Sequence, residues 1–176
     1  KRDFWTVYPE VPSGKIYGET AKDDGLAAYT ARLDAAFDLV DHPAEGRVGA
    51  EVSPYGPALG ITYPAASADM LVMASRAVAP QWAAASPDVR AGVCLEILAR
   101  LNARSFEMAN AVMHTTGQAF AMAFQAGGPH AQDRGLEAVA YAHAEMSRIP
   151  AQATWTKPQG KGAPIVMEKH WRIVPR

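Results

Sequence analysis

The chain has 176 residues and a net charge of −1, with 49% of its residues apolar and 20% charged. That length fits a single domain, and a near-neutral chain without a basic cluster offers no electrostatic surface to nucleic acid or to an anionic membrane. Charges or prolines interrupt every apolar stretch before the roughly 18 residues of a membrane span. No apolar run follows the charges of the first residues, so we expect no signal peptide. The lone cysteine, Cys94, excludes an internal disulfide and a multi-cysteine metal site, so we expect a cytoplasmic protein.

Residues 1–64 are rich in proline, glycine and aromatic residues, a composition typical of turns and short extended segments. Within them, apolar side chains recur at helical spacing over residues 25–39. We therefore expect an N-terminal extension with turns and one helix.

Residues 67–148 favour helices throughout. Ser67 is a predicted N-cap, and the helix behind it carries an apolar face formed by Leu71, Ala74, Val78 and Trp82. Pro80 should kink or end that helix, because proline cannot donate the backbone hydrogen bond of a helix interior.

A second helix should start at Ser86-Pro87-Asp88, which combines a capping hydroxyl, a proline at the first helical position and an acid near the positive helix end. Its apolar stripe consists of Val93, Ile97 and Leu101, widened by Leu95, Leu98 and Phe106. Gly117 and then Gly127-Gly128-Pro129 interrupt the helical pattern, and residues 131–148 form a last predicted helix.

From Ala151 the pattern changes to the period of a β-strand. Residues 152–157 and 165–174 predict two strands, with turn residues between them at 158–162. We expect a β-hairpin with a long, exposed loop.

Few side chains suggest chemistry by themselves. Cys94 lies two turns into an apolar helix with no histidine beside it, which favours a buried packing residue over a nucleophile. The five histidines lack the spacing of helical metal ligands, so we expect no metal site. We expect His114 to lie at a helix end and His143 to be half-buried on a packed face. Gly127-Gly128-Pro129 lacks a preceding strand and a phosphate-binding spacing, and it reads as a helix break.

Two sets of motifs carry a family resemblance. Residues 69–82 resemble the first helix of the aldehyde dehydrogenase superfamily, an alanine-rich helix that ends in proline, one variable residue and tryptophan. Pro87-Asp88-Val89-Arg90 with the leucine-rich stretch 94–101, and Thr115-Thr116-Gly117-Gln118, also match superfamily patterns. The strings 8–13, 51–56, 91–98, 114–120 and 127–134 resemble the subgroup that acts in phenylacetic acid degradation.

The resemblance implies that this α+β chain is the N-terminal portion of a longer enzyme. Residues 65–150 would be the helical part of an α/β cofactor domain, and 151–176 the hairpin of an oligomerisation region. The Rossmann core and the catalytic domain, with the nucleophilic cysteine, a general-base glutamate and the NAD or NADP site, would lie in the missing portion. The family reaction is thiolate attack on an aldehyde, hydride transfer to the cofactor, and release of the acyl group to water or coenzyme A.

For the chain itself, the resemblance implies no catalytic, cofactor or metal residue. It implies a homo-oligomer formed through the hairpin, with apolar contacts from Trp155, Ile165, Met167 and Trp171. The substrate would be a small-molecule aldehyde, CoA-linked in the subgroup. His130 and Arg134, one turn apart, are candidates for the substrate entrance; the alternative for Arg134 is a pair with Asp133, Glu137 or solvent. A function of a different class, a non-catalytic helical and hairpin assembly module, is also open.

Overall fold

The computed structural model describes residues 7–38 and 43–174, which combine helices with two small antiparallel sheets. The α+β composition expected from the sequence is confirmed. The helices are α1 (Gly14–Tyr17), α2 (Ala21–Thr30), α3 (Ala68–Ala84), α4 (Pro87–Ala103), α5 (Ser105–Thr116), α6 (Phe120–Gly127) and α7 (Pro129–Ser147). The strands are β1 (Gly46–Val48), β2 (Tyr63–Ala65), β3 (Gln152–Gln159) and β4 (Gly162–His170).

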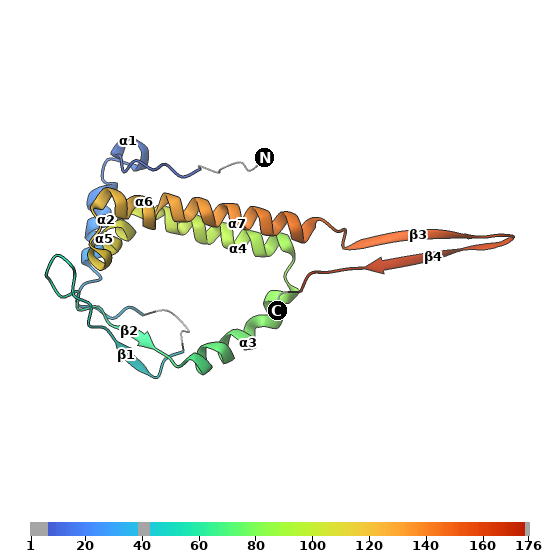
Figure 1. Ribbon diagram of the computed structural model, residues 1–176, viewed down its shortest axis with the longest axis horizontal. Coiled ribbons are helices and arrows are strands. Elements are labelled where there is room, and N and C mark those ends of the chain that lie inside the picture. The colour runs from blue at the N-terminus through green and yellow to red at the C-terminus, as the bar shows by residue number, and fades with distance from the viewer. Residues whose placement is uncertain (1–6, 39–42, 175–176) are drawn as a thin grey trace.

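The long helices α4 and α7 lie side by side and antiparallel, and they organise the molecule (Figure 1). At one end of this pair, α1, α2, α5 and α6 gather into a cluster. At the other end, the β3–β4 hairpin projects away from the helices, and α3 departs from the start of α4 on a separate path. The chain is therefore extended, with one compact end.

Aromatic side chains form the core of the compact end. Phe106 of α5 and Phe124 of α6 are buried, with ring centroids 4.9 Å apart. Tyr17 of α1 meets each of these rings edge-on, with centroid distances of 5.5 Å. Such edge contacts add about 0.5–1.5 kcal/mol each beyond the burial of apolar area. Helix α2 reaches this core because Gly25 leaves room for Phe106.

The predicted capping residues Ser67 and Ser86 and the predicted helix breaks at Gly117 and at the glycine-proline segment are confirmed. The Ser67 hydroxyl accepts a hydrogen bond from the Met70 N–H, and the Ser86 hydroxyl accepts one from the Val89 N–H. Gly117 ends α5 in the left-handed conformation, with φ of 77°. Gly128 lies between α6 and α7, so the glycine-proline break separates two helices as expected.

The bounds of one predicted helix were wrong. The helix expected over residues 25–39 begins earlier and ends at Thr30, since Asp34 has a φ of 54° and its N–H donates to the Leu59 carbonyl. The expected end at Leu39 lies outside the described residues. For Pro80 we expected a kink or a helix end; α3 continues past it to Ala84, so the helix does not end there.

The hairpin turn is shorter than predicted. Strand β3 extends to Gln159 and β4 begins at Gly162, so only Gly160 and Lys161 connect them, with Gly160 at a φ of 49°. At the other end β4 stops at His170, four residues before the predicted limit. A tight turn that uses a left-handed glycine fits the twist of the strands better than a long loop.

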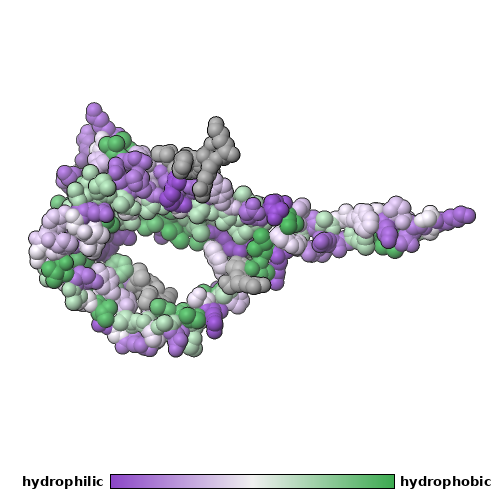
Figure 2. Space-filling view, viewed as in Figure 1, coloured by the Kyte–Doolittle hydropathy of each residue, from purple (hydrophilic) through white to green (hydrophobic). Residues whose placement is uncertain are grey.

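Much of the apolar surface stays in contact with water. No residue of α3 is buried, and Met73 is 71% exposed. Of the α4 stripe expected to face the core, Val93 and Ile97 are exposed, whereas Leu98 is buried because α7 approaches it at Gly135. The space-filling view shows apolar residues along α3 and an opening between α3 and the α4–α7 pair (Figure 2).

Substitution of Gly25 tests how closely α2 and α5 approach. A Cβ at this position would lie 2.3 Å from the Phe106 Cβ, so Gly25→Ala should lower the free energy of unfolding by about 1–3 kcal/mol. Gly46→Ala is the matched control, because nothing lies within 4 Å of the added atom, and it should stay within about 0.5 kcal/mol of wild type. Thermal or urea unfolding of the full-length protein measures both, and equal effects would contradict the close approach.

Candidate functional site

The start of α7 holds the two residues that the sequence proposed for a substrate entrance. Here the N-terminal segment crosses the helix. The Nε2 of His130 lies 3.2 Å from a carboxylate oxygen of Glu10, and Arg134 forms an ion pair with Glu137. Both side chains face the surface, each about half exposed. The structure thus gives both residues intramolecular partners and places them on the same helical turn.

Asp133 is the residue of this region whose role the sequence did not reveal. Its side chain is buried, and its Oδ1 accepts hydrogen bonds from the backbone N–H groups of Val7 at 2.9 Å and Tyr8 at 3.2 Å. A buried carboxylate needs such donors to offset the loss of hydration. Asp133 therefore anchors the N-terminal segment, a contact between residues more than 120 positions apart in sequence.

A buried polar network next to Asp133 connects three helices. The side-chain amide of Asn102 donates to the side-chain oxygen of Gln132 at 2.9 Å, and the side-chain amide of Gln132 donates to the Ser105 hydroxyl at 3.2 Å. The Ser105 hydroxyl donates in turn to the backbone carbonyl of Asn102 at 2.8 Å. Each group is satisfied within the network, so its clearest role is to fix the junction of α4, α5 and α7.

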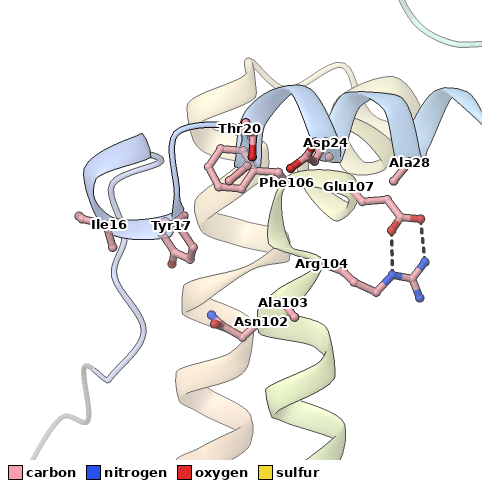
Figure 3. A pocket seen from close by; sticks show the side chains of 12 residues that line it. Ile16, Tyr17, Thr20, Asp24, Ala28, Asn102, Ala103, Arg104, Phe106 and Glu107 are labelled. Atoms are coloured by element: carbon pink, nitrogen blue, oxygen red, sulfur yellow. Dashed lines mark hydrogen bonds and ion pairs between the residues drawn. The ribbon is translucent and has the colours of Figure 1, made fainter.

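A cavity of about 520 Å³ lies beside this junction, between α1, α2 and the α4–α5 corner (Figure 3). Tyr17 and Phe106 form its apolar wall, and Asp24 lies on its α2 side. Arg104 and Glu107 point toward one another at its edge and are joined by two hydrogen bonds of 2.7 Å. The lining has no cysteine or histidine, so the cavity offers no cysteine–histidine pair.

Glu107 is the residue on which the charge interactions of this cavity depend. Its side chain is 12% exposed, and it also accepts a hydrogen bond from Arg32 at 3.2 Å. The hydrogen bond from Arg104 lowers the pKa of Glu107, and the same contact raises the pKa of Arg104. Burial raises the pKa of Tyr17. Glu107 is therefore held ionised as a link between α2 and the start of α5.

A second polar cluster surrounds His114, which the sequence placed at a helix end. His114 lies in the last turn of α5, where its Nδ1 is 3.0 Å from the Ser53 hydroxyl and its ring stacks on Tyr29 at 5.1 Å. The Tyr55 hydroxyl donates to the carbonyls of Gly117 and Gln118, both at 3.1 Å. Because Ser53 is buried, this serine–histidine contact holds the loop around residues 51–60 to α5.

The remaining candidates lie apart from these clusters. Cys94 is half-buried and lines a cavity with Trp82 and Met146. His143 pairs with Asp88 at 2.7 Å across α4 and α7, as a half-buried residue, while His42 lies outside the described residues. Within the described part of the chain, no three histidine, cysteine or acidic side chains are grouped as metal ligands. In that same part, every helix is too short or too polar to cross a membrane.

Three of the four residues proposed for an interface, Trp155, Ile165 and Met167, share one face of the hairpin. Trp155 lies opposite Met167, and Ile165 lies opposite Lys157 two residues further along. Trp155, Ile165 and Met167 are 58%, 46% and 40% exposed. Trp171 lies beyond β4, half-buried near the start of α4. A two-stranded hairpin with this apolar face has no core of its own to bury it.

Comparison with known proteins gives one informative match. The structure is similar to the crystal structure of an NAD-dependent aldehyde dehydrogenase from Burkholderia multivorans, with a TM-score of 0.93 and 57% sequence identity. The similarity covers 99% of this chain and 31% of that one. No family model and no curated protein matches the chain. The fold is therefore that of a part of an aldehyde dehydrogenase, in support of the resemblance seen in the sequence.

Glu107→Gln tests the ionic link. The substitution removes the charge shared with Arg104 and Arg32, and should lower the free energy of unfolding by about 1–2 kcal/mol at neutral pH. Because the folded-state pKa of Glu107 is below its ordinary value of 4.5, this stabilisation is present above about pH 4.5 and lost as pH falls through the folded-state pKa. Urea unfolding against pH measures the effect. Glu96→Gln, which breaks the exposed pair with Arg100, is the control and should change little.

Proposed function

We propose that this chain is part of an NAD-dependent aldehyde dehydrogenase. The observation that carries the proposal is 57% identity at a TM-score of 0.93 over 99% of the chain, to a protein named as such an enzyme. Identity at this level, spread over a fold with an extended shape and a projecting hairpin, is hard to reconcile with an unrelated origin. The chain spans 31% of that protein, so the activity of the whole enzyme is assigned by similarity.

The described residues do not themselves fit a dinucleotide. Such cofactors bind where a parallel strand ends in a glycine-rich turn before a helix, and the described strands form only two antiparallel pairs. The clusters at Asp133, Glu107 and His114 are satisfied internally and hold helices or loops together. We therefore assign this chain a supporting role, and the cofactor and the nucleophile to the polypeptide outside it.

The exposed apolar faces support this division of roles. Helix α3 has 17 residues and buries none, although helices in proteins owe most of their stability to the packing of an apolar face. An opening bordered by α3 and the α4–α7 pair is visible in Figure 2. We propose that further polypeptide of the same enzyme packs against these faces, which would bury side chains such as Leu71, Val78 and Val93.

For the substrate we propose a CoA-linked semialdehyde of phenylacetate breakdown, in the cytoplasm. The support is the sequence motifs, above all residues 114–120 and 127–134. The second motif encloses His130 and Arg134, which share a surface turn of α7. A guanidinium there suits a phosphate of the CoA portion, in competition with Glu137.

A kinetic assay of the full-length protein tests this function. NADH should form from NAD with a CoA-linked semialdehyde, and Arg134→Ala should raise the Michaelis constant for that substrate but not for a small free aldehyde. Cys94→Ser is the control and should retain turnover, because Cys94 lies in a packed helix. Failure of every aldehyde to yield NADH would reject the enzyme assignment, whereas equal effects of Arg134→Ala on both substrates would reject only the entrance role.

The same enzyme should be a homo-oligomer, and the support is the apolar face of the hairpin. Trp155→Lys combined with Met167→Lys places two cations on that face and should reduce the mass measured by light scattering. Thr154→Lys, on the opposite face of β3, is the matched control and should leave the mass unchanged. A wild-type protein that is monomeric at assay concentrations would contradict the proposal. An oligomer without dehydrogenase activity would favour the alternative, a non-catalytic assembly module.

A further inference from the structure

Arg90 of α4 is a buried cation whose hydrogen bonding is incomplete. The residue is 6% exposed, and its Nε is buried without a hydrogen-bond partner. One contact is made by the guanidinium, from an Nη atom to the Ile173 carbonyl at the long distance of 3.4 Å. A guanidinium carries five N–H donors and stays charged at all physiological pH values. Its burial in this state is unfavourable unless an acceptor is supplied.

Among the described residues, the surroundings of Arg90 contain a second cation and no acid. A cavity of about 150 Å³ lies between the α3–α4 turn, the end of α7 and the chain after β4, and both Arg90 and Arg172 line it. On its other side Arg90 borders the cavity that contains Cys94. Neither cavity is lined by an aspartate or a glutamate. Asp88, two residues before Arg90 in α4, is 86% exposed and paired with His143, and residues two apart on a helix do not face each other.

We infer that the cavity between Arg90 and Arg172 is a carboxylate site, occupied by an acidic side chain from the part of the polypeptide outside this chain. Buried arginines are nearly always paired, and a carboxylate can accept two parallel hydrogen bonds from one guanidinium. A volume of about 150 Å³ suits one side chain and is too small for a dinucleotide. The inference rests on the proposed function only in that more polypeptide is present.

The carboxylate site would connect three segments at one point. Arg90 already holds the Ile173 carbonyl, so the bound carboxylate would be fixed to α4 and to the chain that leaves the hairpin. Arg90 is a positioning residue in this arrangement. A free small anion, such as acetate or phosphate, has the same chemistry, and the experiment separates the two sources.

The test is the melting temperature of the full-length protein and of Arg90→Met between about pH 8 and pH 5.5. Loss of the guanidinium leaves a buried carboxylate unpaired, which should lower the melting temperature at pH 8 by on the order of 5–10 °C. The unpaired carboxylate has a raised pKa, so its penalty is largest at high pH and disappears as pH falls through that pKa. The difference in melting temperature between the two proteins should therefore become smaller as the pH falls. The His143–Asp88 pair is present in both proteins and cancels.

Two further variants serve as controls for the interpretation of the melting temperatures. Arg90→Lys retains the charge and should show a smaller loss with no pH-dependent gap, which covers the case in which Arg90→Met does not fold. Arg100→Met, which removes an exposed arginine of the same helix, should match wild type. A difference in melting temperature between wild type and Arg90→Met that stays constant with pH would mean that only neutral carbonyls bind Arg90. An Arg90→Met protein as stable as wild type would mean that Arg90 has no partner. Either result overturns the inference. So would acetate or phosphate that stabilises wild type but not Arg90→Met, because the site would then be empty in the protein. Since the readout is stability, these results are independent of whether the enzyme oxidises an aldehyde.

Discussion

The need to remove apolar surface from water governs this structure. Burial of apolar area is the dominant favourable contribution to folding, at about 25 cal/mol per Å². The compact end satisfies this requirement with the rings of Tyr17, Phe106 and Phe124, whereas α3 and the hairpin satisfy none of it. Because the chain matches about a third of a longer aldehyde dehydrogenase, our proposal is that further polypeptide covers these exposed faces.

Polar contacts, by contrast, are almost complete inside the compact end. Glu107 is shared by two arginines from different segments, and Gln132 is satisfied by Asn102 and Ser105. These contacts give the junction of α4, α5 and α7 a single arrangement, so the two long helices leave it in fixed directions. The direction of α7 in turn fixes where the hairpin projects (Figure 1). A rigid internal frame with open apolar edges fits a supporting role within a larger enzyme.

Features of the fold that depend on neighbouring residues could be predicted from the sequence, whereas features that depend on contacts between residues far apart in the sequence could not. Ser67, Ser86 and Gly117 act within one helical turn, so their effect depends on a few neighbouring residues. The end of α2 depends on the Leu59 carbonyl, which no pattern near Asp34 reveals. The same limit applies to the candidate sites: Asp133 was one expected surface partner of Arg134, whereas it is buried under a segment from the other end of the chain.

The contact between Asp133 and the backbone of Val7 and Tyr8 also has a consequence for the order of folding. Its two ends are separated by more than 120 residues, so it closes a loop that includes almost all of the helical part. Contacts of such high sequence separation form late, because the entropy of loop closure must first be offset by nearer contacts. During synthesis, residues 7–13 therefore leave the ribosome long before their anchor exists. The N-terminal segment stays open to chaperones and proteases until α7 has emerged and folded.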